Sequence, residues 1–81
     1  GGDFRLLAID ADIPEAFTAH GIAPKVLRVS AKGNPALVER YLGAAKSAVY
    51  LIRPDQHVAA RWDRFDADAV STALARAIAK D

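Results

Sequence analysis

Residues 48–62 read AVYLIRPDQHVAARW, and they carry the strongest structural signal in the chain. Its first part, residues 48–52, is apolar throughout, which is typical of a central strand covered on both faces. Residues 53–56 follow as a turn, because Pro54 presets the φ angle of the second turn position. Residues 57–62 then alternate between two faces, with Val58, Ala60 and Trp62 on one and His57, Ala59 and Arg61 on the other. The stretch therefore predicts a β-hairpin whose second strand is a half-exposed edge.

Two further strands are predicted upstream of this hairpin. Residues 4–9 (FRLLAI) form a nearly continuous apolar run that is too short for a helix, and residues 26–30 (VLRVS) form a second short strand. Between them, Asp12 with Glu15 fits a capping box and Gly21 fits a left-handed C-terminal cap, so we expect a helix of about two turns. Strand, helix and strand in this length imply a right-handed crossover between parallel strands.

Two more helices complete the predicted elements. In the first, Asn34 is the expected cap, Pro35 takes the first helical position and Gly43 ends the helix. Its apolar stripe consists of Leu37, Val38, Tyr41 and Leu42. The final helix begins at Asp66, with Phe65 and Val70 placed as a hydrophobic staple. Its buried stripe consists of Val70, Leu74, Ala77 and Ile78.

The order β-α-β-α-β-β-α predicts an α/β domain of the thioredoxin-like class. We expect a mixed four-stranded sheet in the order 2-1-3-4, with helices on both faces, which explains why the first and third strands lack polar alternation. A ferredoxin-like sandwich is the main rival, but it needs β-α-β-β-α-β and this chain ends in a helix. No repeat or linker divides residues 3–81, so we expect one domain. Gly1 and Gly2 are interpreted as a cloning remnant.

The composition excludes several classes of chemistry and of partner. The 81 residues include no cysteine and two histidines, so disulfides, thiol catalysis, iron–sulfur clusters and His-rich metal sites lack their ligands. A net charge of +1 provides no electrostatic attraction to nucleic acid or to an anionic membrane. No apolar run approaches the roughly 20 residues of a membrane span. We therefore expect a cytoplasmic protein that binds neither nucleic acid nor membranes.

Catalysis has no support in the sequence either. Redox enzymes of the thioredoxin-like class need a nucleophilic cysteine after the first strand, where residues 10–13 read DADI. They also place a proline before the third strand, where residues 45–47 read AKS. Ser71 and Thr72 have no histidine partner that sequence reasoning brings within reach. We therefore predict no catalytic, cofactor-binding or metal-binding residue, and we expect that this chain is not an enzyme.

Other candidate sites have simpler structural explanations. Asp10, Asp12 and His20 match no metal-ligand spacing, and Asp12 already serves as a predicted cap. Residues 32–34 (KGN) precede a helix N-terminus, which is a generic anion site, but the nucleotide-binding patterns are missing. Three aromatic residues lie on predicted buried stripes and are assigned to the core rather than to a binding surface: Tyr41, Tyr50 and Trp62.

Residues 48–61 resemble the signature hairpin near the C-terminus of FAD-dependent aromatic hydroxylases, the phenol-hydroxylase-like monooxygenases. The pattern of that family runs approximately L-V-R-P-D-G-H-V-A-W-R. The residues that match it are Arg53, Pro54, Asp55, His57, Val58, Ala59 and Arg61. Gln56 replaces the usual glycine, which costs roughly 1 kcal/mol if this position is left-handed, and Ala60 replaces the usual tryptophan. Residues 41–43 and 4–9 are also similar to those domains.

In that family a large N-terminal region binds the flavin and the substrate. The resemblance therefore implies that this chain is a non-catalytic C-terminal domain, packed on the FAD and substrate domains of the same chain or assisting their assembly. It implies FAD and NAD(P)H for the parent enzyme and no cofactor here. One alternative is a free-standing, cysteine-less thioredoxin-like domain that binds partner proteins or forms a homodimer. A small independent enzyme ranks last, because the sequence assembles no acid, base, nucleophile or metal.

Overall fold

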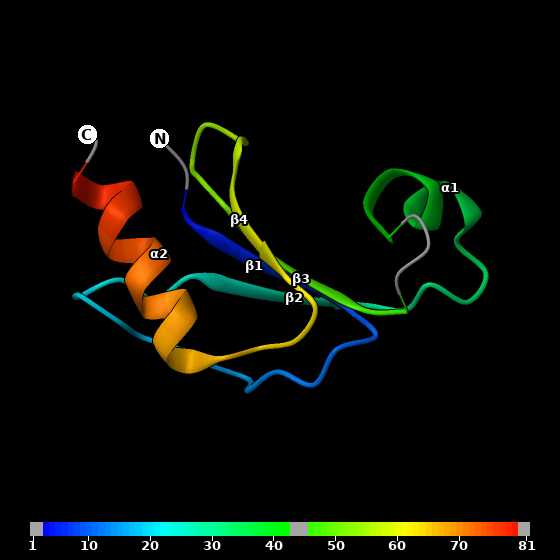
Figure 1. Ribbon diagram of the computed structural model, residues 1–81, viewed down its shortest axis with the longest axis horizontal. Helices are drawn as coiled ribbons and strands as arrows, with labels where there is room; N and C mark the ends of the chain where they lie inside the picture. The colour runs from blue at the N-terminus through cyan, green and yellow to red at the C-terminus, as the bar shows by residue number, and fades with distance from the viewer. Residues whose placement is uncertain (1–2, 43–45, 80–81) are drawn as a thin grey trace.

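Four strands form a single mixed sheet in the computed structural model of this chain, which describes residues 3–42 and 46–79 (Figure 1). The strands are β1 (Arg5–Ile9), β2 (Lys25–Val29), β3 (Ala48–Ile52) and β4 (Val58–Trp62). The sheet order is β2-β1-β3-β4. β1 lies parallel to β2 and antiparallel to β3, and β3 lies antiparallel to β4. The predicted sheet order and strand directions are confirmed.

The two central strands, β1 and β3, contribute to a hydrophobic core on each face of the sheet. Side chains that alternate along β1 and β3 point to opposite faces, so the sheet has two apolar layers. The larger layer is built on Leu6, Ala8, Val49 and Leu51, and the smaller on Leu7, Ile9, Ala48 and Tyr50. This two-sided burial is the physical reason that both strands are apolar at every inner position.

Helix α2 (Ala67–Ala79) covers the larger layer. The helix starts directly after Asp66, the predicted first residue, and the Asp66 Oδ1 caps it by accepting a hydrogen bond of 3.1 Å from the Ala69 N–H. Val70, Leu74 and Ala77 are buried along one stripe, and Phe65 and Ile78 pack against the same cluster. The expected buried stripe of the final helix is therefore confirmed.

The other face of the sheet is covered by α1 (Pro35–Leu37) and the π-helix η1 (Val38–Leu42). Pro35 opens α1 as predicted, but the Asn34 side chain does not cap it. The Asn34 Nδ2 instead donates to the Ser30 carbonyl at 2.8 Å, within the turn that precedes the helix. Leu42 is buried against the smaller layer, and the predicted terminator Gly43 lies outside the described residues. Helices thus lie on both faces, and Figure 1 shows α1 and α2 at opposite ends of the molecule.

The predicted helix from Asp12 to Gly21 is wrong. Residues 11–18 are irregular, and residues 19–22 form a tight turn closed by hydrogen bonds of 2.9 and 3.0 Å between Ala19 and Ile22. Gly21 is left-handed as expected, at φ 74°, but it serves this turn rather than a helix end. Two turns are too short to be stable alone, and the expected caps form no side-chain bonds among the described residues. The segment instead places Ile13 against the same core layer as α2.

Candidate functional site

The hairpin of β3 and β4, whose sequence resembles the hydroxylase pattern, is closed by a tight turn. The Gln56 N–H donates to the Arg53 carbonyl at 2.9 Å, and the Arg53 N–H donates to the His57 carbonyl at 2.8 Å. Gln56 has a φ of 71°, which lies in the left-handed region that favours glycine. Such a residue after a type I turn lets the strands resume pairing with their native twist. The turn predicted from Pro54 is confirmed.

Asp55 organises the polar groups of this turn. Its Oδ1 accepts a hydrogen bond of 3.1 Å from the His57 N–H, which is the local Asx arrangement expected of a turn aspartate. Its Oδ2 lies 3.4 Å from the Arg53 guanidinium and 3.3 Å from the His57 Nδ1. The His57 backbone hydrogen bond, followed by the His57 ring and the Arg53 charge, lowers the pKa of Asp55 below its ordinary value of 3.8. A charged carboxylate therefore stabilises the turn.

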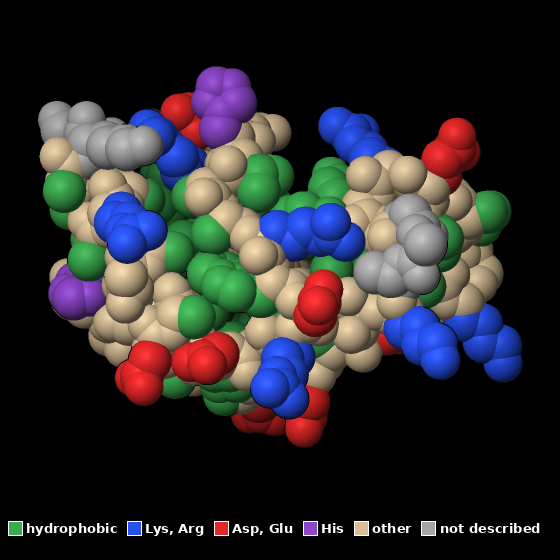
Figure 2. Space-filling model, in the orientation of Figure 1, with side chains coloured by type: hydrophobic (Ala, Val, Ile, Leu, Met, Phe, Trp, Pro, Cys, Tyr) green, Lys and Arg blue, Asp and Glu red, His purple; other side chains and the backbone are tan. Residues whose placement is uncertain are grey.

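A groove of about 610 Å³ runs between the hairpin and α2. Its walls come from both elements, and they consist of Arg53, His57, Val58, Ala59 and Ala60 from the hairpin and Ala73, Arg76, Ala77 and Ala79 from α2. Figure 2 shows apolar side chains gathered in the hollow between these two elements. Val58 remains 51% exposed although it is apolar. The structure thus brings together four of the seven signature residues along one groove.

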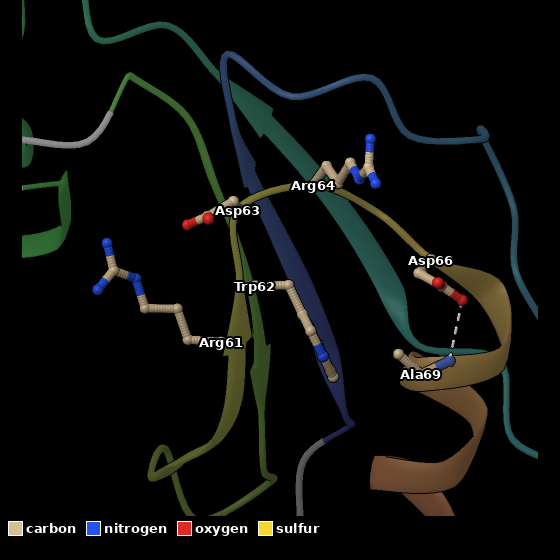
Figure 3. A pocket seen from close by; sticks show the side chains of 6 residues that line it. All are labelled: Arg61, Trp62, Asp63, Arg64, Asp66 and Ala69. Atoms are coloured by element: carbon tan, nitrogen blue, oxygen red, sulfur yellow. Dashed lines mark hydrogen bonds between the residues drawn. The ribbon is translucent and has the colours of Figure 1, made fainter.

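Arg61 and Trp62 point to opposite sides of β4 (Figure 3). The Trp62 ring packs against the larger core layer, and the Arg61 guanidinium lies 5.6 Å from the centre of the Tyr50 ring on the other face. Both residues border a second, polar hollow of about 460 Å³, which is completed by Asp63, Arg64, Asp66 and Ala69. The assignment of Trp62 and Tyr50 to the core is confirmed, and Arg61 is separated from the groove.

The floor and the lining of the groove differ in chemical character. In the described part of the chain no polar or charged side chain is buried, and no three metal-ligating residues gather. The floor of the groove is apolar because Ala60, Ala73 and Ala77 belong to or pack against the larger core layer. Cationic side chains, Arg53 and Arg76, stand at its rim.

The other candidate residues are dispersed. The Asp10 carboxylate accepts a hydrogen bond of 3.1 Å from the Ala31 N–H, which ties the end of β1 to the loop after β2. His20 lies instead at the turn of residues 19–22, against α2. Gly33 is left-handed, at φ 79°, and the Asn34 N–H donates to the Ala31 carbonyl at 3.0 Å. The backbone of residues 32–34 is therefore organised as a turn.

One expectation about these residues is wrong: Ser71 does have a histidine within reach. The His20 Nε2 lies 3.1 Å from both the Ser71 Oγ and the Ser71 carbonyl oxygen. The carbonyl oxygen can only accept a hydrogen bond, whereas the Ser71 hydroxyl can donate or accept, so the His20 ring can bond to Ser71 in either tautomer. This pair tethers the irregular segment to α2. Nothing in the local sequence signals a contact between positions 51 residues apart.

Comparison of the chain with protein-family models, with curated proteins and with solved structures returns no significant match. In the described residues, no helix combines the length and the apolar character needed to cross a membrane.

Proposed function

We propose that this chain is a non-catalytic interaction domain of a flavin-dependent aromatic hydroxylase. In this proposal it packs on the FAD and substrate domains of the same polypeptide or aids their assembly, in the cytoplasm where NAD(P)H is supplied. FAD and NAD(P)H belong to the parent enzyme and not to this domain. The residues that resemble the hydroxylase signature then serve as an interdomain contact.

The observation that carries the proposal is the shared groove of the hairpin and α2. Arg53, His57, Val58 and Ala59 all match the signature, and all four line this groove. The turn accounts for Arg53, Pro54, Asp55 and His57, but it needs no exposed valine on the adjoining strand. Val58 is 51% exposed, and covering the rest of its surface contributes about 1 kcal/mol to an association. Val58 is therefore an exposed apolar side chain that the turn of the hairpin does not use.

The first test is the mass of the natural polypeptide. An antibody against this domain is used to probe an immunoblot of the source cells, and the reactive protein is purified for its absorbance spectrum. A band several times heavier than 8.6 kDa that carries yellow flavin absorbance is the expected result. A band at the size of this chain would overturn the proposal and would favour a free-standing thioredoxin-like interaction domain.

A second test addresses the groove. Val58→Asp in the heavier protein adds a charge to the proposed contact, whereas Ala36→Asp adds the same charge on α1, away from the groove. We expect the Val58 variant to lose flavin or to become several-fold more sensitive to protease between its domains, because a desolvated carboxylate disfavours the contact. The Ala36 variant should behave as the parent does. Equal behaviour of the two variants would show that the groove is not the contact.

A further inference from the structure

The outer edge of β2 is the unprotected edge of the sheet. Four of its five residues are exposed, and they include the apolar Leu27 at 47% and Val29 at 36%. β4, the opposite edge, is interrupted by a register shift opposite Leu51 and Ile52 and packs against α2. β2 has neither form of protection, because its pairing with β1 is regular over all five positions. A regular, exposed edge strand is a template for another strand.

The direction of the backbone groups along β2 follows from its bonds to β1. The Lys25 N–H donates to the Phe4 carbonyl at 2.9 Å, and the Val29 carbonyl accepts from the Asp10 N–H at 3.0 Å. In a parallel pair the bonded residues alternate, so the odd-numbered residues of β2 face β1. Val26 and Arg28 therefore direct their N–H and C=O groups outward. Among the described residues, no hydrogen bond reaches these four groups.

We propose that β2 pairs antiparallel with β2 of a second copy of this chain, around a two-fold axis at Leu27. The two sheets then form one continuous eight-stranded sheet, and each Val26 exchanges two hydrogen bonds with Arg28 of the other copy. The two Leu27 side chains meet on the face that also carries Leu7 and Tyr50. A two-fold axis makes the contact self-complementary and closes the assembly at two copies.

The register follows from the residues of the strand. An axis at Arg28 places the two guanidinium groups directly opposite each other, and like charges in that position destabilise a strand pair. An axis at Val26 places Arg28 opposite Pro24, which has no N–H to donate, and it places Leu27 opposite Lys25. With the axis at Leu27, Lys25 faces Val29 and Arg28 faces Val26. Each cation of the strand is then opposite an apolar residue.

Neither the remaining charges nor the helices obstruct this pairing. The Lys25 ammonium lies 3.4 Å from the Asp3 carboxylate, and an Arg28 guanidinium nitrogen donates to the Ile13 carbonyl at 3.2 Å. Both cations are therefore engaged within their own copy. The main contacts of helix α2 are with β3 and β4, which β1 separates from β2 in the sheet order. A five-residue edge is smaller than a standard interface, so we expect a dimer that forms at micromolar concentrations or above.

The test uses the absence of cysteine from the chain. Leu27→Cys introduces a single thiol at the two-fold axis, in a directly opposed pair whose Cβ atoms are close enough for a disulfide. Val29→Cys is the matched control. Position 29 lies on the same strand and the same face as position 27, but in this register it is opposite Lys25 and far from position 29 of the second copy. Val58→Cys is a second control on β4. With diamide as the oxidant, we expect Leu27→Cys to form the covalent dimer at least tenfold faster than either control.

Sedimentation equilibrium of the unmodified chain provides an independent measurement. The weight-average mass should rise toward twice 8.6 kDa with concentration, and Leu27→Lys should hold it at the monomer value. A monomer at every concentration, growth beyond two copies, or equal cross-linking of Leu27→Cys and Val29→Cys would each overturn the inference. The inference is independent of the hydroxylase proposal, because it involves neither the hairpin nor a flavin.

Discussion

Replacing Gln56 with glycine should stabilise the domain. Gln56 has a φ of 71°, and a left-handed conformation costs a residue with a Cβ atom about 1–2 kcal/mol. Glycine avoids this cost but loses about 0.5–1 kcal/mol of additional backbone entropy on folding. The difference is a net gain of about 0.5–1 kcal/mol in the free energy of unfolding. The turn hydrogen bond from the Gln56 N–H to the Arg53 carbonyl involves only the backbone, so it is kept in the variant.

The assay is urea unfolding followed by the fluorescence of Trp62, the single tryptophan, which is packed against the core beneath α2. With a slope of about 1 kcal/mol per molar urea, the midpoint of Gln56→Gly should rise by about 0.5–1 M. Gln56→Ala is the matched control, because it removes the side chain and keeps the Cβ, and its midpoint should stay near that of the parent. A glycine variant no more stable than the alanine variant would refute the reasoning.

Three further predictions follow from the described contacts. Asp55→Asn should destabilise the domain at neutral pH, and this effect should disappear as the pH falls below 3.8, because Asp55 with its lowered pKa stabilises the fold only while its carboxylate is charged. Urea unfolding of both proteins across this pH range measures the difference in their stability, and a difference that does not change with pH would contradict the prediction. Tyr50→Phe removes the hydroxyl that donates to the Tyr41 carbonyl, and it should lower the free energy of unfolding by about 1 kcal/mol. An unchanged urea midpoint would contradict this prediction. Leu74→Ala should cost about 3–5 kcal/mol in the same assay, since the side chain is fully buried, and a loss below 1 kcal/mol would contradict that packing.

The sequence predicted the strands best, because strand patterns depend on a few neighbouring residues. The bounds of β3 (Ala48–Ile52) coincide with the predicted residues 48–52, and the turn at Pro54 follows from a φ angle that its ring imposes. The irregular segment after β1 was predicted worst. Its capping residues Asp12 and Glu15 and the glycine at position 21 are each compatible with a helix, but a segment of this length depends on tertiary packing for its stability.

The amino-acid sequence was thus enough to predict which segments are strands, their order in the sheet, the turn of the hairpin and the absence of thiol chemistry. These features depend on residue identity and short-range periodicity. Only the tertiary structure decided that the signature residues and α2 share a groove, that His20 meets Ser71, and that the edge of β2 is open. Each of these depends on how distant segments pack, and side-chain burial between such segments leaves no local pattern from which it can be read.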